Sequence, residues 1–174
     1  DDVKGAINTL DESQIRRVVS LLLDARKNNR KVFLMGEGPS GLVARAFAMR
    51  LAELSYNVFV IGETITSAVE KNDLFVAITA SGKTPLLVEA AKIAKEKAMA
   101  KIIAVTSSAR SSISKLADAI LMIKATSGEP TDQDSYLSTQ LTGSYLSTGR
   151  IIFEIAATCV LEAIVSEITS TATS

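Results

Sequence analysis

A polar turn with three hydroxyl groups and a glycine lies between a predicted strand and a predicted helix. The apolar run at 74–78 leads directly into the sequence Thr-Ala-Ser-Gly-Lys-Thr at 79–84, and a helical apolar pattern continues to residue 98. The first turn of a helix has N–H groups without intrahelical partners, and the helix dipole favours negative charge there. This turn is therefore suited to bind an anion through Thr79, Ser81, Gly82 and Thr84.

A second turn of the same kind follows the apolar run at 31–35. Its sequence, Gly-Glu-Gly-Pro-Ser-Gly at 36–41, precedes a helical pattern at 42–55, and Ser40 occupies the position expected of a helix N-cap. Ligands of open parallel sheets bind beyond the carboxyl ends of the strands, where the order of the crossovers reverses. Two hydroxyl-bearing turns after strands favour an anion site more strongly than one turn does.

These turns also suggest two nucleotide-binding alternatives. The turn at 36–41 matches G-x-G-x-x-G, so it could bind a dinucleotide whose ribose hydroxyl is held by Glu63, just after the next predicted strand. Pro39 stiffens this turn where a pyrophosphate would need to approach closely, and the second hydroxyl-rich turn would then have no role. The second turn resembles the end of a P-loop, but Ala77 stands where that motif needs glycine, so nucleotide hydrolysis is not expected.

Glu154 is the carboxylate whose sequence surroundings best suit proton transfer. Its neighbours at 151–157 are otherwise apolar, and a carboxylate in such surroundings has a raised pKa because burial disfavours its charged form. A purely structural role is an equally open alternative. Five residues recur every four positions and would form a polar stripe along a helix at 150–168: Arg150, Glu154, Thr158, Glu162 and Ser166. We expect Cys159, in the apolar part of this helix, to be a small buried core residue.

The composition argues against several classes of function. Nineteen basic and nineteen acidic residues balance in the 174-residue chain, so no basic surface is expected for nucleic acid or for a membrane. Histidine is absent, which removes the histidine-dependent triads and the histidine-rich zinc sites. The single cysteine permits no intrachain disulfide, and the sequence shows neither a leader-like opening nor an apolar run of about eighteen residues. We therefore expect a cytoplasmic protein.

Five short apolar runs alternate with helical patterns along the chain. The expected strands are 31–35, 57–61, 74–78, 101–105 and 119–123, and the expected helices are 3–28, 42–55, a short one ending at 69, 84–98, 111–116 and 150–168. Because parallel neighbours need crossover connections, this alternation predicts one α/β domain over 1–174 with a doubly wound parallel sheet. Residues 1–30 would form a helical arm and 169–174 a disordered tail. The Ser-, Thr- and Gly-rich stretch 124–149 would be a lid, a binding loop or an interface segment.

Four passages of the sequence resemble the sugar isomerase (SIS) domain and, within that family, the 6-phospho-3-hexuloisomerases. They are the segments 36–43 with 46–51, 58–64, 73–84 and 153–155. The Ser-Gly-x-Thr loop at 81–84 marks SIS domains in general, whereas Gly-Glu-Thr at 62–64 and Phe-Glu at 153–154 indicate the hexuloisomerases. The resemblance implies a three-layer α-β-α sandwich of the flavodoxin-like SIS type, with a five-stranded parallel sheet, assembled as a homotetramer.

The resemblance also implies an activity and a site. The activity is interconversion of 3-hexulose 6-phosphate and fructose 6-phosphate, a step of formaldehyde assimilation or pentose supply, without a metal or a cofactor. Glu154 matches the proton acceptor of the family, and the passage from Tyr136 to Gln140 matches one near the substrate and the subunit contact. The implied ligands of the substrate phosphate and its neighbours are Ser40, Thr79, Ala80, Ser81, Gly82, Lys83 and Thr84.

Two departures from the family pattern, and two alternatives within it, qualify this expectation. Lys83 stands where the loop of the family has glutamate, and it could strengthen phosphate binding or simply occupy a solvated helix start. The segment 148–152 replaces a Pro-x-Gly turn before Phe153. The chain could be another SIS-type phosphosugar isomerase, although the absence of histidine weighs against members that open a sugar ring with that residue. It could also be a non-catalytic module that binds a phosphosugar, a type usually joined to a DNA-binding region.

Overall fold

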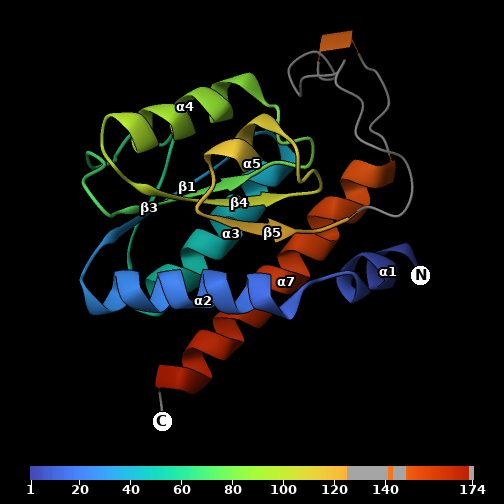
Figure 1. Cartoon of the computed structure of the whole chain (residues 1–174), viewed down its shortest axis with the longest axis horizontal. Coiled ribbons are helices and arrows are strands. Elements are labelled where there is room, and N and C mark those ends of the chain that lie inside the picture. Colours follow the sequence, from blue (N-terminus) through green and yellow to red (C-terminus); the bar gives the residue numbers. More distant parts are fainter. Residues whose placement is uncertain (125–140, 143–147, 173–174) are drawn as a thin grey trace.

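Five parallel strands form one sheet in the computed structural model (Figure 1), which describes residues 1–124, 141–142 and 148–172. The strands are β1 (Lys31–Gly36), β2 (Asn57–Val60), β3 (Leu74–Ile78), β4 (Lys101–Thr106) and β5 (Ala119–Met122). Their order across the sheet is β2-β1-β3-β4-β5, and all neighbours are parallel. The predicted α/β class and the five-stranded doubly wound sheet are confirmed.

Helices cover both faces of this sheet (Figure 1). They are α1 (Asp2–Asn8), α2 (Glu12–Lys27), α3 (Pro39–Glu53), α4 (Pro85–Glu96), α5 (Ser112–Leu116) and α7 (Thr148–Ala172). Along β1, Val32 and Leu34 belong to the core formed with α2, α3 and α7, whereas Phe33 and Met35 belong to the core formed with α4 and α5. Because successive side chains of a strand point to opposite faces, this alternation produces the predicted three-layer sandwich.

Asp73 fixes the start of β3 to the start of β1. Its carboxylate is 2% exposed and accepts hydrogen bonds from the backbone N–H groups of Lys31 at 2.9 Å and Glu70 at 2.8 Å. The Lys31 ammonium lies 3.8 Å from the same carboxylate. At the other end of β1, Gly36 pairs with Ile78 at the end of β3, so the two strands end at the same level.

The expected helix at 3–28 is two helices. α1 ends at Asn8, and α2 begins after Asp11, whose side chain caps it by accepting a hydrogen bond from the Ser13 N–H at 2.8 Å. α2 then packs against β3 and β5 and buries Val18 and Leu22 in the core. Residues 2–8 and 12–27 are therefore helical, and α2 belongs to the layer that α3 and α7 also form.

The expected short helix ending at residue 69 is absent, and that prediction is wrong. After β2 the chain forms turns at 61–65 and has no regular structure at 66–70. The Lys31 ammonium binds the carbonyl of Ala68 at 2.7 Å and the hydroxyl of Ser67 at 3.3 Å. Three consecutive residues here, Thr64, Ile65 and Thr66, are β-branched and disfavour helix, so tertiary contacts decide the path of the chain.

The last helix continues to Ala172, so the prediction that the chain is disordered from residue 169 is wrong for 169–172. The hydroxyl groups of Thr169, Ser170 and Thr171 donate to the carbonyls four residues earlier, at 2.8 to 3.0 Å. Such bonds let Ser and Thr residues remain in a helix. Residues 173–174 of the expected tail, and 125–140 and 143–147 of the expected lid or interface segment, lie outside the described residues.

In the described parts of the chain, no helix has the length and apolar character needed to span a membrane.

Candidate functional site

The carboxyl ends of β1 and β3 meet where the direction of the crossovers reverses. From β1 the chain passes to β2 on one side, and from β3 it passes to β4 on the other. The 36–41 turn leaves the end of β1 and the 79–84 loop leaves the end of β3, at the same level of the sheet. The structure therefore places both predicted anion-binding segments where ligands of open parallel sheets bind.

Glycines close the 36–41 turn upon itself. A Cβ added at Gly36 would lie 2.5 Å from the carbonyl oxygen of Ser40, and one added at Gly41 would lie 2.9 Å from that of Gly36. Gly38, with φ of 55°, is the N-cap of α3, and Pro39 is its first residue. The prediction that Ser40 is the N-cap is wrong: the N-cap is Gly38, two residues earlier, because the fixed φ of Pro39 suits the first position of the helix. Ser40 lies in the first turn and is 7% exposed.

Ser40 lies against Glu154, 114 residues later in the chain. The hydroxyl of Ser40 donates to Oε1 of Glu154 at 3.2 Å, which joins the start of α3 to α7. Burial raises the pKa of Glu154 above its usual range, while the hydrogen bond from Ser40 and the charge of Arg150 act in the opposite direction. Glu154 is thus a partly buried carboxylate beside the turn that ends β1.

The polar stripe predicted on the last helix exists, and it faces α3. Glu154 contacts Ser40, and two turns later Glu162 accepts two hydrogen bonds from the Nε of Arg50, both at 3.1 Å. Both acids are thereby tied to α3 side chains across the α3–α7 contact. Both alternatives considered from the sequence therefore apply to this stripe. Its side chains hold α7 against α3, and one of them, Glu154, is the carboxylate that could transfer a proton.

The 79–84 loop is folded by its own hydroxyl groups. The hydroxyls of Thr79 and Thr84 lie 2.9 Å apart, the N–H of Gly82 donates to Thr79 Oγ1 at 3.3 Å, and the N–H of Lys83 donates to Ser81 Oγ at 3.3 Å. Thr79 is 4% exposed, whereas Lys83 is exposed to solvent. The bonds of 3.3 Å are long and can be exchanged for bonds to an anion.

Residues that the sequence did not single out hold this loop from the side of β4. The N–H of Ile113 donates to the carbonyl of Gly82 at 3.0 Å. Gly82 has φ of +67°, and a Cβ there would lie 2.1 Å from Oγ of Ser111. One signal in the sequence could have pointed to this segment after β4. Three hydroxyl residues, Thr106, Ser107 and Ser108, directly follow the fourth apolar run, and hydroxyls after a strand are the pattern that identified the 79–84 loop.

Glu63, the candidate ribose ligand of the dinucleotide alternative, is engaged elsewhere. Its carboxylate accepts a hydrogen bond from Nε of Arg45 at 2.9 Å, and both side chains are about half exposed. Among the described residues, no three Asp, Glu, Cys or His side chains converge as a metal site would require. The polar groups near the ends of β1 and β3 therefore include hydroxyls, backbone amides, Lys83 and the carboxylates of Glu37 and Glu154.

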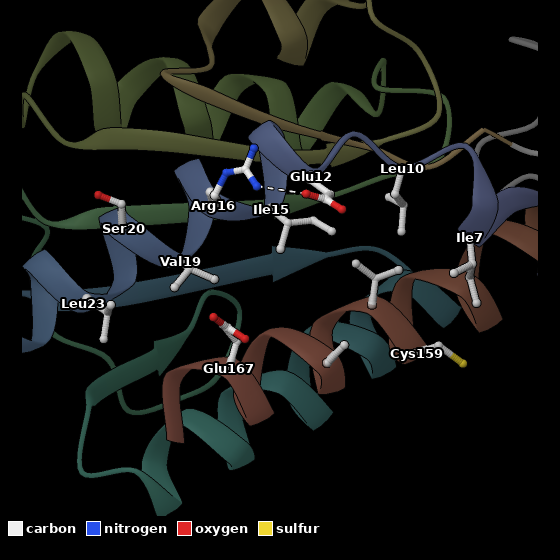
Figure 2. A pocket seen from close by; sticks show the side chains of 12 residues that line it. Ile7, Leu10, Glu12, Ile15, Arg16, Val19, Ser20, Leu23, Cys159 and Glu167 are labelled. Atoms are coloured by element: carbon white, nitrogen blue, oxygen red, sulfur yellow. Dashed lines mark hydrogen bonds and ion pairs between the residues drawn. The ribbon is translucent and has the colours of Figure 1, made fainter. Parts of the chain in front are cut away.

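Cys159 is exposed, so the prediction that it is a buried core residue is wrong. Its helix turns Ala156, Ala157 and Val160 to the core, which leaves Cys159 on the outer side. There it borders a groove of about 710 Å³ between α7 and the pair α1–α2 (Figure 2). Most side chains that line this groove are apolar, and none is a predicted site residue. The groove is thus distinct from the candidate site.

Comparison with known proteins supports the same fold. The SIS domain family matches residues 26–151. An uncharacterized protein of Aeropyrum pernix is 39% identical over 139 residues, which are 80% of this chain and 65%, or less than two thirds, of that protein. A protein of Mycobacterium gastri named 3-hexulose-6-phosphate isomerase is 38% identical over 144 residues, which are 83% of this chain and 69% of that protein.

A solved structure shows how far the similarity extends in space. The crystal structure of a hypothetical protein of Methanococcus jannaschii, for which a 3-hexulose-6-phosphate isomerase function was inferred, superposes with a TM-score of 0.74. It is 27% identical, and the match covers 99% of this chain and 90% of that one. The chain belongs to the SIS domain family. Within that family it has relatives, at 36 to 42% identity, that are named 3-hexulose-6-phosphate isomerase.

Replacement of Gly82 tests whether the 79–84 loop is held in this conformation. We expect Gly82→Ala to lower the free energy of unfolding by about 3 kcal/mol, because it adds a clash with Ser111 to the strain of a positive φ. Gly62→Ala is the matched control: Gly62 has φ of +98° with open space around its Cβ position, so a loss of about 1–2 kcal/mol is expected. Urea denaturation measures both, and equal losses would show that the contact with Ser111 does not constrain the loop.

Proposed function

We propose that this chain is a sugar phosphate isomerase that interconverts 3-hexulose 6-phosphate and fructose 6-phosphate. The observation that carries the proposal is the position of Glu154, a partly buried carboxylate hydrogen-bonded to Ser40 beside the turn that ends β1. The names of several relatives support the choice of substrate. The hydroxyls and amides of the 79–84 loop supply the donors that a phosphate needs.

The reaction moves a carbonyl group from C3 to C2 of the sugar. A base removes the proton from C2 of 3-hexulose 6-phosphate, the electron pair of that C–H bond forms the C2–C3 double bond, and the C3 carbonyl oxygen takes the negative charge. Movement of a proton between the two oxygens of this 2,3-enediolate, and return of a proton to C3, give fructose 6-phosphate. Glu154 takes the first proton and returns the last one.

The surroundings of Glu154 suit a group that both accepts and donates a proton. Its pKa is raised by burial, so its protonated form persists to a higher pH than that of an exposed glutamate. The hydrogen bond from Ser40 and the nearby charge of Arg150 favour the ionised form, which is the base. Both protonation states are therefore accessible closer to neutral pH, as the reaction requires.

The phosphate is remote from the bonds that change, so its binding energy serves to position the sugar. In our proposal the ligands of this group are Ser40 and the loop residues Thr79, Ala80, Ser81, Gly82, Lys83 and Thr84. A carboxylate at position 83, usual in the family, would repel the phosphate, whereas the Lys83 ammonium attracts it. The substitution of Lys for Glu therefore favours phosphate binding.

Glu154→Gln tests the proton-transfer role. Because Gln keeps the size of the side chain but cannot accept a proton, we expect kcat to fall by about 10²–10⁴-fold while the Kd for fructose 6-phosphate changes little. Glu162→Gln is the matched control, since Glu162 lies on the same side of α7 and is paired with Arg50. Coupled turnover assays and isothermal titration give the two quantities. Near-full turnover of Glu154→Gln would refute the assignment. If the wild-type chain itself binds fructose 6-phosphate but does not turn it over, a phosphosugar-binding module is favoured instead.

We also propose that the chain assembles as a homotetramer through the outer sides of α3 and α7. Large apolar side chains are exposed there: Leu42 is 66% exposed, Met49 53%, Ile151 46% and Ile155 47%. Such a concentration of exposed apolar residues on two contacting helices is typical of a subunit interface. The apolar groove between α7 and the pair α1–α2 borders the same helix (Figure 2).

The tetramer is tested by light scattering during size-exclusion chromatography. We expect a mass of about four times the 18.5 kDa of the chain. Ile155→Asp should give a smaller species, because a charge in an apolar interface must be desolvated without a partner. Ile93→Asp is the control, since Ile93 is 44% exposed on α4, on the other face of the sheet. A wild-type mass of one chain, or identical masses of both variants, would contradict the proposed interface.

A further inference from the structure

The carbonyl oxygen of Ala80 accepts three hydrogen bonds from Thr106, the last residue of β4, and Ser107, which follows it. The hydroxyl of Ser107 donates to it at 2.7 Å, the backbone N–H of Ser107 at 3.0 Å, and the hydroxyl of Thr106 at 3.1 Å. Thr106 is 0% exposed and Ala80 is 7% exposed. A carbonyl oxygen has two lone pairs, so three donors leave this group no freedom to turn.

The fixed carbonyl also fixes the direction of the next N–H group. In a trans peptide the C=O and the following N–H point in opposite directions, and the carbonyl of Ala80 points toward β4. The N–H of Ser81 therefore points away from β4. Because β3 lies between β4 and β1, this direction is toward the side of β1 and its 36–41 turn. Within the described residues, the N–H of Ser81 has no hydrogen-bond partner.

A second peptide of the loop, Gly82–Lys83, is held from the same side. Ile113 donates its N–H to the carbonyl of Gly82 at 3.0 Å, and Gly82 packs directly against the side chain of Ser111. Ser111 cannot easily move away, because its hydroxyl lies 2.9 Å from that of Ser114 and donates to the carbonyl of Ser108 at 3.0 Å. The segment after β4 thus supports the loop after β3 at two carbonyls, those of Ala80 and Gly82.

We propose that Ser107 is a positioning residue for anion binding: its hydroxyl holds the Ala80–Ser81 peptide so that the Ser81 N–H faces the side of the 36–41 turn and binds the phosphate of the substrate. Ser107 acts through this peptide and does not itself need to touch the ligand. The identity of the ligand as a sugar phosphate rests on the proposed function. The arrangement of the peptide rests only on the contacts of Ala80.

The variant Ser107→Ala removes the shortest of the three hydrogen bonds and leaves the other two. The peptide gains freedom to turn, so part of the binding energy of an anion must be spent on fixing it again. We expect the Kd for inorganic phosphate and the KM for fructose 6-phosphate to rise by about three- to tenfold, the effect of one hydrogen bond. The value of kcat should stay within about twofold, because the reacting carbons are remote from the phosphate.

Two further variants separate positioning from general damage to the fold. Ser107→Thr keeps the hydroxyl and should restore the affinity, and Ser112→Ala, an exposed serine of α5, should leave the affinity unchanged. Isothermal titration with inorganic phosphate gives the Kd, and steady-state turnover of fructose 6-phosphate gives KM and kcat separately. A loss of kcat equal to the rise of KM, or an unchanged Kd in Ser107→Ala, would overturn the positioning role.

The phosphate titration also separates this inference from the proposed isomerase function. If the wild-type chain binds phosphate but does not isomerise the sugar, the proposed reaction fails, and the comparison of Ser107→Ala with Ser107→Thr still decides the positioning role. If the wild-type chain does not bind phosphate at millimolar concentration, the inference is refuted. If it isomerises the sugar while Ser107→Ala binds phosphate as the wild type does, the isomerase proposal stands and the positioning role fails.

Discussion

The pairing of β1 with β3 is the constraint on which the candidate site depends. These strands are far apart in sequence, but Asp73 fixes their starts and the register places Gly36 opposite Ile78 at their ends. The 36–41 turn and the 79–84 loop consequently leave the sheet side by side. A shift of the register by one residue would turn the alternating side chains of β3 to the wrong cores, so burial on both faces maintains the site.

Two further contacts complete the site from opposite sides of this strand pair. From the α3 side, Ser40 binds Glu154 and brings the carboxylate of the last helix to the end of β1. From the β4 side, Ser107 and Thr106 hold Ala80 and so fix the direction of the loop after β3. The two sides of the candidate site differ in chemistry. The hydroxyls and amides of the 79–84 loop suit the binding of a phosphate, whose charge persists, whereas the Glu154 carboxylate, with its raised pKa, suits proton transfer.

The sequence was sufficient to predict the features that depend on local pattern. The five strands are short apolar runs followed by polar turns, and the 36–41 turn and the 79–84 loop were singled out because glycine and hydroxyl residues stand directly after such runs. The position of Ser40 shows the limit of this approach: α3 begins at Pro39, two residues earlier than an N-cap at Ser40 would imply, so Ser40 is a partner of Glu154 and not the N-cap. The segment 62–69 shows another limit, because the Lys31 ammonium determines its path from 37 residues away.

What the sequence could not supply were contacts between residues distant in the chain. Nothing in the local pattern around Ser107 indicates that its hydroxyl binds Ala80, and nothing near Glu162 indicates its partner Arg50. The exposure of Cys159 was mispredicted for the same reason: an apolar helix segment does not reveal which of its sides meets the core. The pairing of Glu162 and the exposure of Cys159 depend on how α7 lies on α1, α2 and α3, which only the folded chain determines.

The central claim is that Glu154 moves a proton between C2 and C3 of a phosphosugar held by the segments that follow β1 and β3. The most direct test is to incubate the protein with fructose 6-phosphate in D₂O and to follow each carbon-bound proton by ¹H NMR. A 2,3-enediolate formed by Glu154 predicts deuterium at C3 with the wild-type chain and none with Glu154→Gln. Deuterium at C1 would instead indicate an aldose–ketose isomerase, and exchange at C3 that persists in Glu154→Gln would contradict the account.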